Sequence, residues 1–144
     1  MIDLQRGVAA AVVGVLGALA TVHVYWAMGG RAGSEGVVPE VNGRKTINPG
    51  PGATLGVAAL LALAALNVAL RSRWVEVAFV PDALVRVGVW TLAVVFALRA
   101  VGDFRTVGFF KKVRATRFAA LDTRVFSPLC AALSIGCAVV AGGP

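Results

Sequence analysis

The sequence is short of charged and chemically reactive side chains. Only 15% of its 144 residues are charged, and it holds one histidine, one tyrosine and two cysteines. An ordinary soluble domain has about a quarter of its residues charged. A soluble fold of this length could not bury the 58% of residues that are hydrophobic. These shortages exclude an ordinary soluble domain and predict an integral membrane protein.

The few reactive side chains show no recognisable site. Cys130 and Cys137 are seven residues apart, so on one helix they lie roughly 10 Å apart, which is too far for a disulfide with each other. Two thiols and one histidine without ligand spacing do not predict a metal site. The GK[ST] signature of a phosphate-binding loop is also missing. We therefore expect structural cysteines, no metal and no cofactor, and we leave open whether the protein is an enzyme.

What the sequence has instead is long hydrophobic runs. Four of them are close to the ~20 residues needed to cross ~30 Å of hydrocarbon. They cover residues 7–28, 53–70, 83–101 and 123–140. The first run is longer than the roughly 7–15 residues of a cleaved signal peptide, so we expect it to be retained. The sequence predicts a single all-α domain over residues 1–144, a four-helix bundle in the membrane with a Gly/Pro-rich first loop and a basic third loop.

Lysine and arginine are distributed unequally between the two sides of this bundle. The first and third loops together hold eight of them, whereas the opposite side holds three or four. Cytoplasmic loops carry such an excess, so both termini are expected outside. This bias, with attraction to anionic headgroups, accounts for most of the formal charge of +7. Because no nucleic-acid motif accompanies the charge, we expect membrane lipids and no nucleic acid as partners.

Polar and aromatic residues are predicted to gather at one end of the bundle. The stretch HVYWAMGG, residues 23–30, ends the first run, and the third run ends and the fourth begins on the same membrane face. Residues far apart in the sequence would therefore meet at the cytoplasmic end, where a pocket would be built. The candidates for this pocket are His23, Tyr25, Trp26, Arg99, Asp103, Arg105, Asp122 and Ser127.

The candidates have structural alternatives. Tyr25 and Trp26 are typical of an aromatic belt at a headgroup boundary, and a lone histidine such as His23 is more often a hydrogen-bonded packing residue. Arg99 is the stronger candidate, because a charge inside a membrane helix costs ~2.5–3.5 kcal/mol on insertion scales and usually faces the bundle or a watery cavity. Asp103, four residues on, is its expected partner. Snorkelling of the arginine to the headgroups is the alternative.

The segments beside these residues also allow two interpretations. Asp122 directly precedes the predicted fourth span, where a capping role alone could explain it. The basic loop, residues 102–122, alternates cations with phenylalanines, which favours a segment lying in the membrane interface with its lysines as anchors. The turn-rich stretch NPGPGAT, residues 48–54, would form either an ordered lid or a cradle of backbone amides for an anion.

The sequence resembles a known family. HVYWAMGG, a Pro/Gly-rich loop, RAVGDFRTVGFFKK and FAALDTRVFSPLC resemble a bacterial family of small four-span membrane proteins, domain of unknown function 3995. The resemblance covers nearly the whole chain. It implies the fold and a place in the bacterial inner membrane, with no activity attached. It also implies that the recurrent polar positions of the family correspond to His23, Trp26, Gly29, Arg99, Gly102, Asp103, Asp122 and Pro128.

Three functions fit this pattern. We favour a protein that binds or moves a small anionic or lipid-like ligand, with Arg99 and Arg105 supplying charge and Trp26 forming a wall. The second is a membrane-embedded enzyme acting on a lipid or isoprenoid, with His23 and an aspartate as acid and base. The third is an accessory or assembly subunit that docks on a membrane protein partner. The sequence favours the first without naming a ligand.

Overall fold

The structure is a computed structural model that describes residues 2–42 and 44–143. It contains four long helices, each long and apolar enough to cross a membrane. They are α1 (Ile2–Ala27), α2 (Pro51–Arg71), α3 (Asp82–Val101) and a fourth helix made of α4 (Arg117–Leu121), a π-helical segment (Asp122–Phe126) and α5 (Ser127–Gly142). The predicted fold class, an all-α four-helix membrane bundle, is confirmed. The strands among the described residues are the antiparallel pair β1 (Glu40–Val41) and β2 (Arg44–Lys45).

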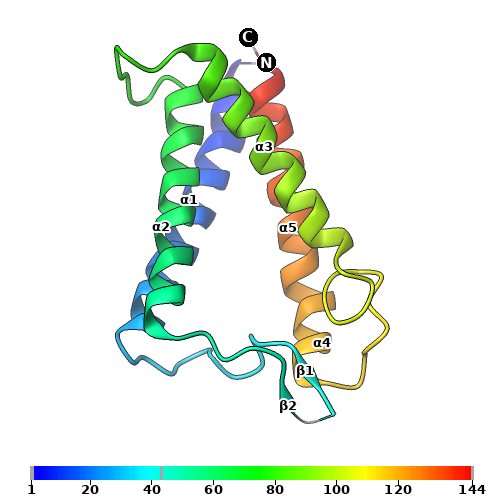
Figure 1. The fold of residues 1–144 in the computed structure, drawn as a ribbon. Coiled ribbons are helices and arrows are strands. Elements are labelled where there is room, and N and C mark those ends of the chain that lie inside the picture. The colour runs from blue at the N-terminus through cyan, green and yellow to red at the C-terminus, as the bar shows by residue number, and fades with distance from the viewer. Residues whose placement is uncertain (1, 43, 144) are drawn as a thin grey trace.

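The four helices form two closely packed pairs. α1 packs along α2, and α3 packs along α5. Figure 1 shows that the pairs converge near the two chain termini and the α2–α3 link, which we call the terminal end, and separate toward the other end, which we call the diverging end. The shared core contains Leu16, Val68, Val89, Cys137 and Val140, all fully buried.

Polar contacts tie the helices together at the terminal end. Gln5 of α1 donates its side-chain amide to the carbonyl of Val140 at 3.1 Å. Arg71, at the end of α2, donates to the carbonyl of Gly143. The last carbonyls of a helix have no partner within it, so donors from other helices stabilise its end. These contacts fix the C-terminus of α5 against α1 and α2.

The fourth helix begins earlier than its hydrophobic run predicts. It starts at Arg117 because the side chain of Thr116 accepts a hydrogen bond from the amide of Ala119 at 3.1 Å, which caps the helix. Asp122 therefore lies inside the helix, and the prediction that Asp122 caps its start was wrong. The amphipathic first turns, which bury Phe118, belong to this helix and not, as the hydrophobic run predicts, to the basic loop.

Loop one, residues 28–50, crosses the diverging end from one helix pair to the other (Figure 1). Glu35 forms an ion pair with Arg117 of α4 at 2.7 Å. The chain then passes through the β1–β2 ribbon, where the amide of Thr46 donates to the carbonyl of Pro39 at 2.8 Å, and returns to α2. The loop thus connects the α1–α2 pair to the start of the fourth helix.

Candidate functional site

The polar centre of the protein lies where the fourth helix changes its winding. Asp122 opens the π-helical segment, and its side chain is fully buried. Residues five apart share a face in a π-helix, so the hydroxyl of Ser127 donates to Oδ2 of Asp122 at 3.2 Å. Single π turns inside α-helices are frequent at functional sites.

Donors from α3 and from loop three, residues 102–116, also converge on this carboxylate. Arg99 Nη2 donates to Asp122 Oδ1 at 2.9 Å. The amide of Gly108 and Nζ of Lys111 donate to Oδ2 at 2.8 and 2.9 Å. Lys111 also donates to the hydroxyl of Thr123 at 2.6 Å. We call the three ionic residues Arg99, Lys111 and Asp122 the buried triad, because they join α3, loop three and the fourth helix.

The triad carries an excess positive charge. Burying an ion costs several kcal/mol unless it is paired and hydrogen-bonded. Asp122 pairs with two cations, but its single negative charge balances only one of their two positive charges. Lys111 is only 2% exposed, whereas 34% of the Arg99 side chain is exposed. Arg99 Nη1 is buried and has no hydrogen-bond partner among the residues that the structure describes. Arg99 is therefore the partly exposed member of the triad, and it keeps one donor nitrogen without a described partner.

Two glycines close loop three into a ring that presents Gly108 to the triad. Gly102 ends α3 with φ 91°, and Gly108 has φ 88°. A Cβ built on Gly102 would lie 1.8 Å from the carbonyl oxygen of Val107, and one on Gly108 would lie 2.2 Å from that of Val101. Both contacts are too short for any side chain, so the backbone crossing requires glycine at both positions.

Asp103 holds the interior of this ring. Its Oδ1 accepts the amides of Arg105, Thr106 and Val107 at 2.7–2.9 Å, and its Oδ2 accepts the hydroxyl of Thr106 at 2.7 Å. Desolvation opposes ionisation, but the hydrogen bonds from the Thr106 hydroxyl and from these amides outweigh it and hold the pKa of Asp103 well below its ordinary value. Asp103 organises the loop as an ionised carboxylate.

Two expectations about this region were wrong. Arg99 pairs with Asp122 rather than with Asp103, because the positive φ of Gly102 takes the chain out of the helix before position 103 and the four-residue helical spacing no longer applies. Lys111 is a buried partner of Asp122, so it is not an interfacial anchor. Arg105 contributes its backbone to the loop, since its carbonyl accepts the amides of Lys112 and Val113, and it is exposed.

The aromatic residues of HVYWAMGG organise the end of α1. His23 Nδ1 donates to the carbonyl of Leu19 at 2.7 Å, and its ring meets Trp26 edge-on at 5.2 Å. Trp26 Nε1 donates to the carbonyl of Ala32 at 2.8 Å, and the hydroxyl of Tyr25 accepts the amide of the same residue at 3.4 Å. These side chains thus fold the start of loop one back onto the helix.

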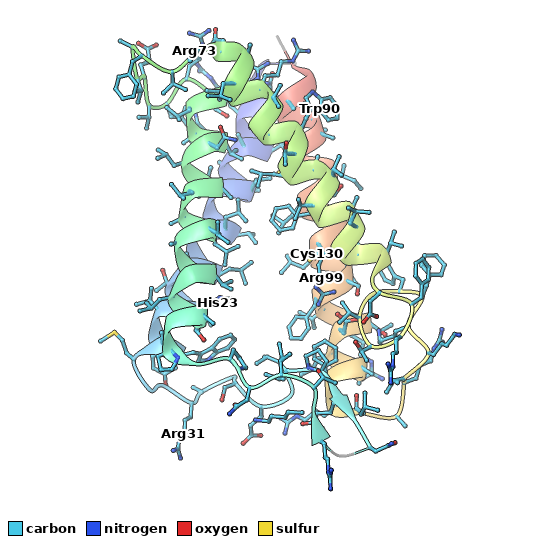
Figure 2. All side chains as sticks on the ribbon, viewed as in Figure 1. His23, Arg31, Arg73, Trp90, Arg99 and Cys130 are labelled. Atoms are coloured by element: carbon cyan, nitrogen blue, oxygen red, sulfur yellow. The ribbon has the colours of Figure 1, made fainter. Side chains whose placement is uncertain are left out.

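The predicted site residues therefore fall into two groups. Figure 2 shows His23 and Arg99 at the diverging end but on different helix pairs. The structure brings Arg99, Asp122 and Ser127 together, with the Asp103 loop beside them. Among the described residues, no hydrogen bond or ion pair joins His23 to Arg99 or Asp122.

A separate cavity of about 560 Å³ lies at the terminal end, between α2, α3 and the link that joins them. Six of its nine lining residues are apolar, and the other three are Arg73, Glu76 and Asp82. It contains none of the predicted site residues. The buried triad lies at the opposite end, and its Asp122 accepts from two cationic side chains.

A family model described as "Protein of unknown function (DUF3995)" matches residues 16–137. The chain belongs to this family. The DUF3995 region runs from the middle of α1 into α5, so the buried triad, loop three and HVYWAMGG all lie inside it. No curated protein and no solved structure matches the chain in the same comparisons.

Sequence reasoning missed three members of the site in this DUF3995 protein: Gly108, Lys111 and Thr123. The local sequence does not distinguish the buried Lys111 from the exposed Lys112 beside it. A usable signal is the pair of glycines that begin and end the loop sequence GDFRTVG. An aspartate directly after a glycine is typical of a tight turn that the aspartate side chain holds.

Proposed function

We propose that this DUF3995 protein binds the anionic head of a small or lipid-like ligand at Arg99. The observation that carries the proposal is the state of the guanidinium: Asp122 holds Nη2, while Nη1 has no hydrogen-bond partner among the described residues. The charge bias of the loops supports a place for this site at the cytoplasmic end of a bacterial inner-membrane protein, with both termini outside.

The triad favours an anion for electrostatic reasons. A single arginine paired with one carboxylate would be neutral overall, but Lys111 supplies a second cation to the same carboxylate at 2.9 Å. The remaining positive charge is exposed through Arg99 and would attract a phosphate or carboxylate. A guanidinium suits this role because its planar donors match two oxygens of such a group.

The preorganisation of Arg99 also supports binding. Its partner Asp122 is fixed by donors from Gly108, Lys111 and Ser127, so the carboxylate cannot swing with the arginine. An arginine whose rotamer is already fixed loses less conformational entropy when a ligand binds. Loop three and the π-helical segment would act as the support of the ligand-binding residue.

Lipid binding by purified variants tests the proposal. Native mass spectrometry would count phosphatidic acid bound to the wild type, to Arg99→Lys and to Arg117→Lys. Arg117 is the matched control because it is exposed at the same end of the bundle. We expect Arg99→Lys to weaken binding about tenfold or more, since a lysine loses the planar fork, and Arg117→Lys to leave it unchanged. Equal binding by all three proteins would refute the proposal.

The source of the anion needs a second measurement. Inorganic phosphate, added to the protein after delipidation, competes with phosphatidic acid if the site recognises the anion alone. If only the lipid binds, its hydrocarbon chain contributes to recognition. Phosphatidylcholine, whose head has no net charge, should bind much more weakly than phosphatidic acid in either case.

The enzyme hypothesis has less structural support. His23 lies on the other helix pair, and no hydrogen bond or ion pair among the described residues joins it to an aspartate, while both oxygens of Asp122 accept hydrogen bonds from cations. A general base needs a free lone pair within reach of the substrate proton. The accessory-subunit hypothesis has no particular contact in its favour, so we retain the ligand-binding function.

A further inference from the structure

Loop three exposes two phenylalanine rings that touch each other. Phe104 is 57% exposed and Phe110 is 61% exposed, and their ring centroids are 6.3 Å apart at an interplanar angle of 36°. We call this pair the aromatic knob. Exposed clusters of large apolar side chains mark sites of interaction with proteins or membranes, whereas the internal contacts of the protein leave these rings uncovered.

The knob is held in a fixed position. Phe104 has φ 60°, a left-handed conformation that a bulky residue adopts only where its surroundings impose it. The carboxylate of Asp103 imposes this conformation through four hydrogen bonds to the backbone and the Thr106 hydroxyl of loop three. On the other side of the loop, the amides of Lys112 and Val113 donate to the carbonyl of Arg105. The rings are therefore presented by an ordered backbone.

The surface around the knob is cationic. Arg105, Lys112 and Arg114 are exposed. The one acidic residue of loop three is Asp103, and its oxygens are occupied by hydrogen bonds within the loop. Lys111 is withdrawn into the triad. None of these three cations forms an ion pair within the part of the chain that the structure describes. Phenylalanine rings surrounded by such cations complement a surface with an apolar interior and an anionic outer layer.

The position of the loop indicates which surface that is. Arg99 lies level with Asp122, so α4 (Arg117–Leu121) continues beyond the end of α3. Loop three is held against this membrane-spanning helix at Asp122, directly after α4, through Gly108 and Lys111. On α3, Leu98 and Val101 are 64% and 38% exposed and directly precede the loop. The apolar outer surface of a spanning helix thus leads into the loop that carries the knob.

We propose that the aromatic knob docks on the anionic headgroup layer of the bilayer that contains the protein. The phenyl rings enter the boundary of the acyl chains, and Arg105, Lys112 and Arg114 contact lipid phosphates. Amphipathic segments bind membranes by the same division of roles, with apolar burial and attraction to anionic lipid adding together. This interaction surface is independent of the ligand proposed for Arg99.

An environment-sensitive probe tests the proposal. In a protein lacking Cys130 and Cys137, a single cysteine at position 104 or 110 is labelled with the fluorophore NBD and placed in lipid nanodiscs. One set contains phosphatidylcholine alone, and the other also contains phosphatidylglycerol. The matched control is Phe79→Cys, because Phe79 is 87% exposed at the opposite end, in a link with a single arginine and no lysine.

We expect probes at both knob positions to show blue-shifted emission and quenching by lipids that carry a shallow nitroxide, more strongly with phosphatidylglycerol. Replacing Arg105, Lys112 and Arg114 with glutamine should make the emission and quenching of the knob probes independent of phosphatidylglycerol. The probe at position 79 should show no dependence on phosphatidylglycerol, with or without these replacements. If a cysteine at position 104 disturbs the strained backbone, position 110 carries the test. Emission typical of water at position 110 in both nanodiscs would overturn the proposal and favour a protein as the occupant.

Discussion

Arg99 on α3 and Asp122 on the fourth helix are 23 residues apart in the chain, and their side chains meet at 2.9 Å. The ion pair joins two neighbouring spans at one depth in the bundle. Lys111 reaches the same carboxylate from loop three at 2.9 Å. The triad therefore both fastens the loop to the bundle and fixes the direction of Arg99, its partly exposed member.

Replacing Asp122 with asparagine should destabilise the protein strongly. The change leaves Arg99 and Lys111 close together without a countercharge, and removing one partner of a buried ion pair costs about 3–5 kcal/mol. Unfolding in mixed micelles with increasing denaturing detergent measures the loss. The control is Asp82→Asn, because the ion pair of Asp82 with Arg73 is exposed and such pairs contribute about 0–1 kcal/mol.

A second substitution separates loss of charge balance from loss of shape. Lys111→Met in the Asp122→Asn background removes one uncompensated cation and keeps an aliphatic side chain of similar length. We expect the double variant to be more stable than Asp122→Asn alone, as is found when buried ion pairs are replaced as a whole. If it is less stable, the charge of Lys111 is not what the carboxylate neutralises.

Gly108→Ala should disrupt loop three. The new Cβ would lie 2.2 Å from the carbonyl oxygen of Val101, on a backbone with φ 88°. The two backbone segments that cross at Gly102 and Gly108 must therefore move apart. The amide of Gly108 would then move away from Asp122. We expect a loss of at least about 2 kcal/mol, within the range for strain plus a lost buried hydrogen bond.

The chain offers a matched control for the glycine substitution. Gly14 lies in the middle of α1, and a Cβ built there meets nothing within 4 Å. Gly14→Ala should be neutral or stabilise the helix by up to about 1 kcal/mol. Similar losses of thermal stability in both variants would contradict the role assigned to the crossing of loop three.

The sequence was sufficient for some parts of the structure and insufficient for others. Hydrophobic length alone predicted four spans, because each backbone crossing a membrane must satisfy its own hydrogen bonds in a helix of about 20 residues. Hydrophobicity does not say which helices pair, so the separation of His23 on α1 from Arg99 on α3 could not be foreseen. Successive spans cross the membrane in opposite directions, so the end of the first span and the end of the third lie on the same side. This rule placed both residues at one end of the bundle, as the structure has them.

The start of the fourth helix was hidden for a different reason. The first turns after Thr116 are basic and amphipathic, so a hydropathy criterion assigns them to the loop. Their helical state depends on the local cap at Thr116 and on the burial of Phe118, and the burial is a tertiary contact. A sequence criterion therefore places Asp122 at the start of the helix as a cap and does not identify its partners, Arg99 and Lys111.

Loop three should keep its structure in mildly acidic solution. The folded-state pKa of Asp103 is depressed, so its contribution to stability is fully present above the ordinary aspartate pKa, about 3.9, and is lost only as the pH falls through the depressed value. Hydrogen-exchange protection factors of the amides of Thr106 and Val107 should therefore not change between about pH 7 and pH 5.

The control for the pH experiment is Asp103→Asn. An amide side chain accepts with one oxygen only, so it cannot replace the carboxylate that holds three amides and a hydroxyl. The two amides should exchange faster in this variant at every pH. Loss of protection in the wild type near pH 6 would instead show that a group other than Asp103 controls the loop.

The last prediction uses Cys130 as a reporter of ligand binding at Arg99. Figure 2 shows Cys130 beside Arg99, and the thiol lies within electrostatic reach of both Arg99 and Asp122. Cys130 is partly exposed whereas Cys137 is fully buried, so a membrane-permeant maleimide should modify Cys130 first. A ligand whose anionic head binds Arg99 would cover this thiol. Phosphatidic acid should therefore slow the modification of Cys130 about tenfold when the site is nine-tenths occupied, and phosphatidylcholine should not.

Arg99→Lys distinguishes protection by a bound ligand from a general effect of the lipid on the micelle. In this variant a cation remains beside the thiol, but the fork that would hold the phosphate is lost, so phosphatidic acid should no longer slow the reaction at the same concentration. Mass spectrometry of the peptides that contain Cys130 and Cys137 reports both thiols in one sample. Equal slowing in the wild type and in Arg99→Lys would show that the lipid acts elsewhere, because protection that does not depend on the guanidinium cannot come from an anion bound to it.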